Sequence, residues 1–256
     1  MPVLETNALT KIYEGTVSCT ALDNVSLTIG EGEFVGIMGP SGSGKTTLLN
    51  VIATIDEPTA GEIVLDGRSP FALDKREKAL FRRRRLGFVF QHYNLLEKLT
   101  VEENVALPLV LDRVPVHEIE TRLEETMRTL GIGHLRAKRT YELSGGQMQR
   151  TAIARAIIHR PALVLADEPT GNLDSRASND VMTTLSALGG RDGATILMAT
   201  HDASAASYCD RVVFIKDGKL VNDMYRGDSR QTFFQRILDM LSLLGGDSRD
   251  VTPARL

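Results

Sequence analysis

One eight-residue segment restricts the possible folds of this chain more than any other. The apolar stretch Phe34–Met38 runs directly into Gly39-Pro40-Ser41-Gly42-Ser43-Gly44-Lys45-Thr46, and a second apolar stretch, Thr47–Ile52, follows at once. The glycines let consecutive backbone N–H groups point inward at an anion, where a Cβ would obstruct them. A helix after the loop adds the positive end of its dipole. The order strand, loop, helix predicts a phosphate-binding loop within an α/β sheet.

The end of this loop carries side chains with specific chemistry. Lys45 can reach the β- and γ-phosphates of a nucleotide, and the Thr46 hydroxyl can bind Mg²⁺. With Thr47 they complete a predicted nucleotide-binding segment over residues 39–47. An ordinary glycine-rich turn is the alternative, and the order of strand, loop and helix disfavours it.

Much later in the chain, the apolar stretch Leu163–Ala166 is followed by the acids Asp167 and Glu168. Carboxylates at the C-terminal end of a buried parallel strand lie where open α/β sheets bind ligands. Asp167 is predicted to hold Mg²⁺ through water, as a hard oxygen ligand. Glu168 is predicted to orient and deprotonate an attacking water, a role that contributes roughly 10²–10⁴ in rate. The alternative is that these acids form an ordinary solvated turn after the strand. The presence of the phosphate-binding loop in the same chain disfavours that alternative.

Short apolar runs alternate with helical patterns along the chain, which predicts a mainly parallel α/β sheet. The predicted strands of this sheet are Glu33–Met38, Leu86–Phe90, Ala162–Asp167, Ala194–Thr200 and Arg211–Ile215. The first, fourth and fifth are continuous apolar runs, typical of buried central strands. Strands of an antiparallel edge are predicted at Val3–Lys11, Val25–Ile29 and Glu62–Leu65, the last ending in the tight-turn pair Asp66-Gly67.

The segment from Gln91 to Arg160 is predicted to be helical almost throughout, as a helical subdomain inserted into the sheet lobe. A three- or four-residue spacing predicts one buried stripe of Val116, Ile119, Leu123, Met127 and Leu130. Gly131 is predicted to end that helix. The expected division is a sheet lobe over 1–90 and 161–225, the helical subdomain over 91–160, and a C-terminal helix and tail over 226–256.

The C-terminal stretch Thr232–Leu244 is predicted to form an amphipathic helix. Its apolar face carries Phe234, Ile237, Leu238, Leu241 and Leu244. Packing on its own domain is favoured over binding a partner.

Composition excludes several classes of protein. With 42% hydrophobic residues the chain can bury a core without disulfides, and Cys19 and Cys209 are predicted to be reduced core thiols. Because 33 acids balance 30 bases, nucleic acid binding is not expected, and the run Arg82–Arg85 is predicted to be a solvated helix end. No signal-peptide pattern or stretch of ~20 apolar residues occurs, so the chain is expected to be cytoplasmic without direct membrane insertion.

Five further segments resemble, in chain order, those of the ATP-binding cassette family. They are Tyr13, Gln91, Leu143-Ser144-Gly145-Gly146-Gln147, Asn172-Leu173-Asp174 and His201. The resemblance implies that Tyr13 stacks on adenine, that Gln91 contacts Mg²⁺ and links the two lobes, and that His201 senses the γ-phosphate. It also implies that the loop ending in Asp174 contacts a second subunit. The fold implied is a two-lobed α/β ATPase with a phosphate-binding loop.

The segment Ser144–Gln147, called the signature segment below, is placed to open a helix with free N–H groups. Because each subunit's own phosphate loop already holds its nucleotide, the family arrangement implies that this second segment caps the γ-phosphate in the opposite subunit. Two ATP molecules then lie between two copies of the chain. A homodimer with ATP and Mg²⁺ is therefore expected.

Some segments of the sequence resemble one branch of the family in particular. The segment from Glu168 to Ser175 is similar to the lipoprotein-release and macrolide-export branch, and the tail from Arg226 to Gly246 to its bacitracin-type peptide-resistance ATPases. The resemblance implies an ATPase at the inner face of the cell membrane, driving an integral-membrane permease that exports or dislodges antimicrobial peptides. A signal relay to a cell-wall hydrolase or sensor kinase stays open. A chromosome-maintenance ATPase is disfavoured, because no long coiled coil separates Lys45 from Ser144.

Overall fold

The computed structural model describes residues 2–16 and 18–245, which are built around a six-stranded sheet. Its strand order is β5-β6-β7-β3-β8-β9, and all neighbours are parallel except the antiparallel pair β8 and β9. The strands are β3 (Phe34–Met38), β5 (Leu86–Phe90), β6 (Leu163–Asp167), β7 (Ile196–Thr200), β8 (Arg211–Lys216) and β9 (Lys219–Tyr225). Every residue of β3 and β7 is buried, as their continuous apolar sequences predict.

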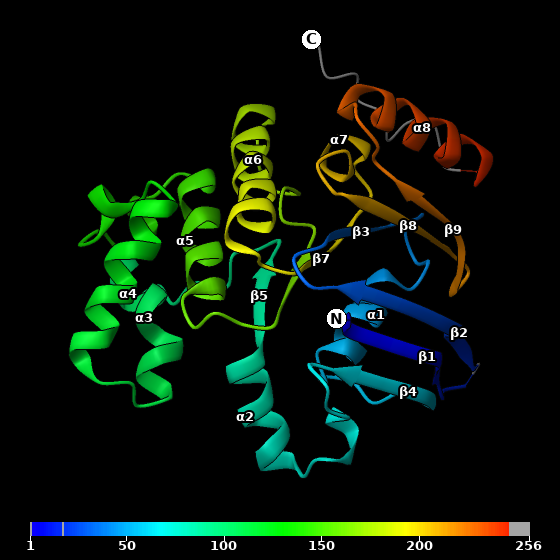
Figure 1. The fold of residues 1–256 in the computed structure, drawn as a ribbon, viewed down its shortest axis with the longest axis horizontal. Helices are drawn as coiled ribbons and strands as arrows, with labels where there is room; N and C mark the ends of the chain where they lie inside the picture. The colour runs from blue at the N-terminus through cyan, green and yellow to red at the C-terminus, as the bar shows by residue number, and fades with distance from the viewer. Residues whose placement is uncertain (1, 17, 246–256) are drawn as a thin grey trace.

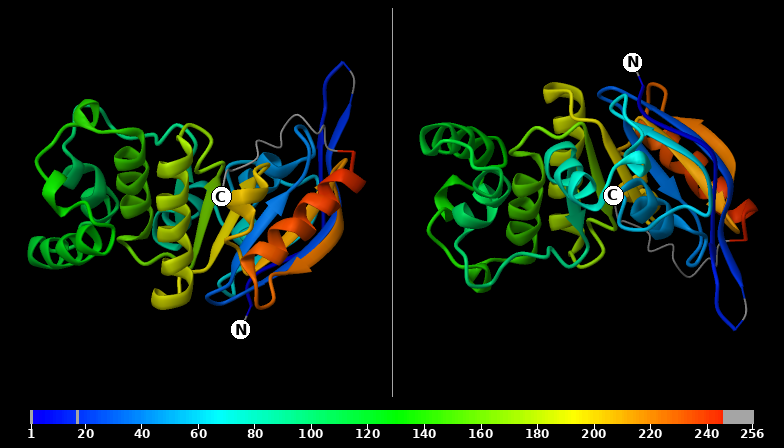
Figure 2. Two further views of the ribbon diagram at one scale, coloured as in Figure 1. Left: turned by 90° about the horizontal axis from the view of Figure 1, so that it is seen from above. Right: turned by 90° about the horizontal axis from the view of Figure 1, so that it is seen from below.

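A second sheet has the order β2-β1-β4 and is antiparallel throughout. It consists of β1 (Pro2–Tyr13), β2 (Cys19–Gly30) and β4 (Ala60–Leu65), and its β1–β2 hairpin projects from the body of the molecule (Figure 2). The antiparallel strands that the sequence predicts here are present, and they form a sheet of their own. The apolar face of this sheet packs on helix α1 (Lys45–Ile52). The main sheet has an antiparallel edge of its own, β9, which the sequence patterns did not reveal.

The helices cover both faces of the main sheet. Helix α1 contributes Leu48 and Val51 to a core shared with the antiparallel sheet, whereas the remaining long helices except α2 contribute to a second core on the opposite face of the main sheet, which α3 and α4 reach through α5. Those helices are α3 (Val101–Leu111), α4 (Val116–Thr129), α5 (Gly145–Ile157), α6 (Ser175–Asp192) and α8 (Arg230–Leu243), with the short α7 (Ala203–Ala206). Helices α3 and α4 lie farthest from the antiparallel sheet (Figure 1).

Helix α2 (Lys75–Arg85) precedes β5 and begins at a capping box between Asp74 and Glu77. The run Arg82–Arg85 forms its last turn, as predicted, but these arginines are bonded rather than merely solvated. Arg84 pairs with Asp112 and Arg85 with Asp66, while the other two donate to backbone carbonyls. Within residues 2–16 and 18–245, three short 3₁₀ turns complete the helices, at Pro70–Ala72, Gly133–Leu135 and Thr140–Glu142.

Several local predictions are confirmed. Asp66 and Gly67 turn the chain with positive φ of 51° and 71°, and Gly131, with φ of 65°, directly follows the end of α4. The C-terminal helix α8 packs on its own domain through buried Phe233 and Ile237.

Other local predictions are wrong. The stretch 91–160 contains three helices with long irregular segments between them, because residues 91–100 serve as a connecting loop. The buried stripe of α4 does not include Val116, which is 75% exposed at the first turn of the helix, whereas Leu123 is 3% exposed. Cys19 is exposed on the projecting hairpin, so only Cys209 is a core thiol. Among the described residues, no helix is both long and apolar enough to cross a membrane.

Candidate nucleotide site

The loop from Gly39 to Gly44 connects the buried end of β3 to the start of α1, and two of its glycines have no room for a side chain. A Cβ on Gly39 would overlap the Ile215 carbonyl oxygen, and one on Gly44 would overlap the Ala21 carbonyl oxygen. Gly44 also has φ of +105°, which L residues rarely adopt. The backbone therefore forms an open cradle of N–H groups, closed beneath by β8 and β2.

Lys45 bends back over this cradle. Its ammonium donates to the carbonyl oxygens of Gly39 at 2.7 Å and Pro40 at 3.0 Å. Burial lowers the pKa of Lys45, an effect that the charges of Glu168 and Asp167 oppose. The cation thus lies between the loop and the two acids at the end of β6.

Asp167, the last residue of β6, lies beside the side chain of Thr46. Burial raises the pKa of Asp167, the neighbouring charge of Glu168 adds to the rise, and the contacts with Thr46 and Lys45 oppose it. A carboxylate and a hydroxyl therefore face each other beside the cradle. This is a hard oxygen donor pair of the type that Mg²⁺ prefers.

Glu168 follows in a left-handed conformation with φ of +46°. Its carboxylate accepts a hydrogen bond from the Thr200 hydroxyl at 3.1 Å, and its Oε1 lies 2.8 Å from Nδ1 of His201. Both partners lie at the end of β7, the strand next to β6 in the sheet. Thr200 was not singled out in the sequence, although its place directly before His201 was a usable signal.

Gln91 directly follows β5 and is tied to the loop after the acids. Asn172 donates from Nδ2 to the Gln91 carbonyl oxygen at 2.9 Å, and a Cβ on Gly171 would lie 2.6 Å from Nε2 of Gln91. The buried Gln149 of α5 joins the same two loops, because its Nε2 donates to the carbonyls of Pro169 at 2.7 Å and Phe90 at 3.4 Å. No sequence pattern indicated Gln149, since a glutamine inside a helix usually faces solvent.

The signature segment begins α5. The Ser144 hydroxyl accepts from the Gln147 backbone N–H at 3.4 Å, and the Ser144 N–H donates to the Gln147 side chain at 3.0 Å. This capping box leaves the N–H groups of Gly145 and Gly146 at an exposed helix start. Helices α5 and α1 pack on opposite faces of the main sheet, so this segment does not belong to the cradle of its own chain. Asp174 also lies outside the cradle. Its carboxylate caps α6 by accepting a hydrogen bond from the Ala177 N–H at 2.9 Å.

Tyr13 ends β1, and two residues missed in the sequence hold its ring. The Tyr13 hydroxyl donates to Asp56 at 2.7 Å, and this hydrogen bond raises the pKa of Tyr13. The Lys11 ammonium lies 4.8 Å from the ring centroid and pairs with the same Asp56 at 2.6 Å. The ring is therefore held in one orientation at the rim of the antiparallel sheet.

The cradle, the paired acids and the residue after β7 occur together in sequence as well as in space. A family model described as ABC transporter matches residues 22–171, more than half of the chain. The chain belongs to the ABC transporter family. As an ABC transporter protein it is an ATP-binding subunit that hydrolyses ATP, and the predicted fold class is confirmed.

Named relatives and solved structures agree with this assignment. An uncharacterized ABC transporter ATP-binding protein of Bacillus subtilis, YvcR, is 59% identical over 250 residues, covering 96% of each chain. The bacitracin export ATP-binding protein BceA of Halalkalibacterium halodurans is 45% identical over 252 residues, covering 98% of this chain and 100% of the relative. A dimeric post-hydrolysis structure of the cassette MJ0796, bound to ADP and Pi, has a TM-score of 0.79 and 40% identity, covering 88% of this chain and all of its own.

Proposed function

We propose that two copies of this chain close around two ATP molecules and drive a membrane permease that exports or dislodges antimicrobial peptides. The substrate class is carried by one observation, the full-length similarity to a relative named for bacitracin export. The closed pair is supported by the similarity to a dimeric cassette structure. In this proposal the chain lies at the inner face of the cell membrane and is held there by the permease.

Each copy would hold the phosphates in its own cradle. Lys45 would exchange its two carbonyl partners for β- and γ-phosphate oxygens, which satisfy an ammonium better because they are charged. Tyr13 would offer the ring face away from Lys11 to adenine. The signature segment of the second copy, with Asp174 nearby, would close over the γ-phosphate from the other side.

Glu168 would act as general base on water. Thr200 and His201 hold its carboxylate at the end of β7, so the base is oriented before nucleotide arrives. Thr46, Asp167 and Gln91 supply the oxygens that would hold Mg²⁺, and the existing contact between Thr46 and Asp167 fits that ion. Bound Mg²⁺ would neutralise phosphate charge. His201, which contacts the same carboxylate, would register loss of the γ-phosphate.

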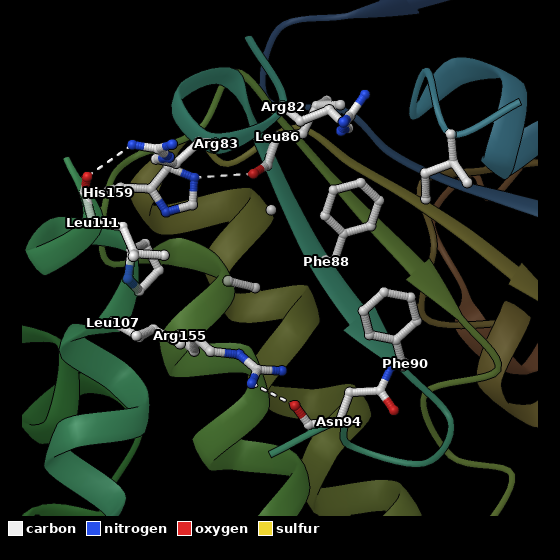
Figure 3. A pocket seen from close by; sticks show the side chains of 14 residues that line it. Arg82, Arg83, Leu86, Phe88, Phe90, Asn94, Leu107, Leu111, Arg155 and His159 are labelled. Atoms are coloured by element: carbon white, nitrogen blue, oxygen red, sulfur yellow. Dashed lines mark hydrogen bonds between the residues drawn. The ribbon is translucent and has the colours of Figure 1, made fainter. Parts of the chain in front are cut away.

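Movement would pass to the permease through the segment from Gln91 to Leu96. This segment borders a groove of about 440 Å³ between β5 and α3, with Phe88, Phe90 and Leu107 among its walls (Figure 3). Arg155 of α5 donates to the carbonyl oxygens of Tyr93 at 2.9 Å and Asn94 at 2.6 Å, so the segment is fastened to the helix that carries the signature segment. A permease loop in this groove would therefore be linked both to Gln91, at the proposed Mg²⁺ site, and to α5, which carries the signature segment.

The test uses tagged Glu168→Gln chain expressed in its own host with ATP and Mg²⁺. Membranes are solubilised in detergent and the co-purifying proteins are identified, while the strain is challenged with bacitracin. The proposal expects a permease with a large extracellular domain and increased sensitivity to the peptide. A small permease accompanied by wall hydrolases, with unchanged sensitivity, would replace peptide removal by a signal relay. Absence of any membrane protein would contradict coupling altogether.

A further inference from the structure

The side-chain amide of Gln149 is buried at a position where an apolar side chain would pack more easily. Gln149 lies in α5, which packs against β5, and the residue is fully buried. Burying an amide costs free energy unless both its nitrogen and its oxygen find hydrogen-bond partners. The nitrogen of Gln149 donates twice, whereas Oε1 has no hydrogen-bond partner among the described residues. An unsatisfied buried oxygen destabilises the fold, so packing alone does not explain this glutamine.

The two acceptors of the Gln149 amide lie beside the candidate catalytic groups. Its Nε2 donates to the carbonyl oxygen of Pro169 at 2.7 Å, and Pro169 directly follows Glu168 in the chain. The same nitrogen donates to the carbonyl oxygen of Phe90 at 3.4 Å, and Phe90 directly precedes Gln91. One amide therefore joins the loop of the proposed general base to the loop of a proposed Mg²⁺ ligand, beyond the ends of the neighbouring strands β6 and β5.

Among the described residues, Asn104 is the other fully buried side-chain amide, and its partners differ in kind. Its oxygen accepts from the Leu96 N–H at 2.8 Å, and its nitrogen donates to the carbonyls of Leu96, Leu99 and Thr100. All these partners lie within eight residues, so Asn104 shapes the loop that leads into its own helix. The partners of Gln149 lie 20 and 59 residues away. Gln149 therefore joins separate elements of the fold.

The signature segment lies one helical turn before Gln149. Ser144 caps α5 and Gly145 is its first residue, so a displacement of the signature segment moves the helix that carries Gln149. A second contact joins the same parts of the molecule. The Tyr93 hydroxyl donates to the Asn172 carbonyl oxygen at 3.4 Å, and a Cβ on Gly145 would lie 3.0 Å from that hydroxyl. The first turn of α5 thus packs against the two loops that Gln149 bonds from the second turn.

We infer that Gln149 is a positioning residue that couples the signature segment of a chain to Glu168 and Gln91 of the same chain. Its amide donates to backbone carbonyls, so it acts through the groups that those carbonyls hold in place. In the proposed dimer the signature segment contacts the ATP held by the other copy. ATP bound there would fix α5, and Gln149 would then fix the general base and the Mg²⁺ ligand at the chain's own ATP. This role rests on the proposed function, because it requires two copies that cap each other's nucleotide.

The first experiment separates hydrolysis from binding. Gln149→Met keeps the length of the buried side chain and removes the amide. We expect kcat for ATP to fall at least about tenfold, because a displacement of about 1 Å at a catalytic group can cost roughly a hundredfold in rate. Affinity for a slowly hydrolysed ATP analogue should stay within about twofold, since the cradle lies on the other face of the main sheet.

Thr151→Val is the matched control for this experiment. Thr151 is also fully buried in α5, but its hydroxyl donates within the helix, to the Gln147 carbonyl oxygen at 2.9 Å. The control should keep the kcat of the unsubstituted chain. An unchanged kcat in Gln149→Met would overturn the inference, and so would an equal fall of kcat in the control or an equal fall of analogue affinity in Gln149→Met.

The second experiment asks which ATP of the pair depends on Gln149. Two mixed pairs are purified through different tags on the two full-length chains, and in each pair one chain carries Glu168→Gln. The first pair has Gln149→Met in the chain that retains Glu168, and the second pair has it in the chain that carries Glu168→Gln. Both pairs therefore contain the same two substitutions and one active general base.

We expect the first pair to hydrolyse ATP at least about tenfold more slowly than the second, because only there is the active base uncoupled from its own α5. A merely disturbed signature segment would slow the second pair instead, since that segment caps the ATP of the opposite chain. Equal rates, or a slower second pair, would overturn the inference. The mass of the Glu168→Gln chain with ATP shows separately whether two copies pair, and thus whether the proposed function holds.

Discussion

At the residue scale, the most informative side chain is Glu168. Its φ of +46° lies in a region that costs a non-glycine residue of order 1–3 kcal/mol, so the surrounding structure must hold it there. Two hydrogen bonds to β7 hold Glu168 in place. The Glu168 N–H donates to the Ala199 carbonyl at 2.9 Å, and the Thr200 hydroxyl donates to the Glu168 carboxylate. The strain turns the carboxylate from the end of β6 toward β7 and His201. Such placement is typical of a group that acts on a ligand.

Lys45 offers a direct test of the cradle. Lys45→Ala removes the ammonium that lies between the loop and the two acids, and we expect ATP affinity to fall at least about a hundredfold, the loss of a charged hydrogen-bonded pair. Titration calorimetry with a slowly hydrolysed ATP analogue measures this. Lys219→Ala is the control, because Lys219 is an exposed lysine at the start of β9 that pairs with Asp23 and not with the loop carbonyls. Unchanged affinity in Lys45→Ala would remove the assignment of this loop.

His159 makes stability depend on pH. Burial lowers its pKa from the ordinary 6.5, and its Nε2 lies 3.0 Å from the Leu86 carbonyl, so the neutral ring donates there. Below pH 6.5 the unfolded chain then binds more protons than the folded chain, and stability falls as pH drops. His159→Gln keeps a donor and removes the titration. We expect urea midpoints of the variant to fall less than those of the wild type between pH 7 and pH 5, and parallel curves would contradict this.

At the scale of elements, helix α4 shows how packing selects among residues with the same pattern. Ile119, Leu123 and Met127 pack toward the core, whereas Val116 continues the spacing but lies at the exposed first turn. Spacing defines the face of a helix, but it does not show how far the neighbouring element extends. Likewise, the alternation of β1 and β4 predicted half-buried strands without showing which sheet they join.

A matched pair of substitutions tests this reading of α4. Leu123→Ala opens a cavity in the core and should cost about 2–5 kcal/mol, while Val116→Ala should stay within about 0.5 kcal/mol. Urea unfolding followed by circular dichroism measures both. Equal costs would show that Val116 is buried after all and that α4 packs differently.

At the scale of the whole molecule, local sequence predicted most of the sheet. Apolar runs of five residues between turn signals are unambiguous, so β3, β5, β6, β7 and β8 lie within two residues of their expected bounds. The cradle was predictable because its residues are contiguous. Contacts such as Gln149 with Pro169, or Asp56 with Tyr13, were not, because they join residues 20 and 43 positions apart that only the tertiary fold brings together.

The separation of the signature segment from the cradle is the main consequence of this architecture. Helices α1 and α5 pack on opposite faces of one sheet, so in the proposed dimer each copy would contribute two separate half-sites for ATP, one at the cradle and one at the start of α5. A second copy, turned about a twofold axis, would complete both halves. ATP is therefore expected to be held between two chains.

The most direct test is the mass of the Glu168→Gln chain in solution with ATP, measured by light scattering during gel filtration. Because hydrolysis is blocked, we expect a particle of about twice the 28.0 kDa of one chain, and the single-chain mass without ATP. Adding Ser144→Arg, which places a bulky side chain at the signature segment, should return the mass to one chain. A single-chain mass with ATP bound would contradict the account.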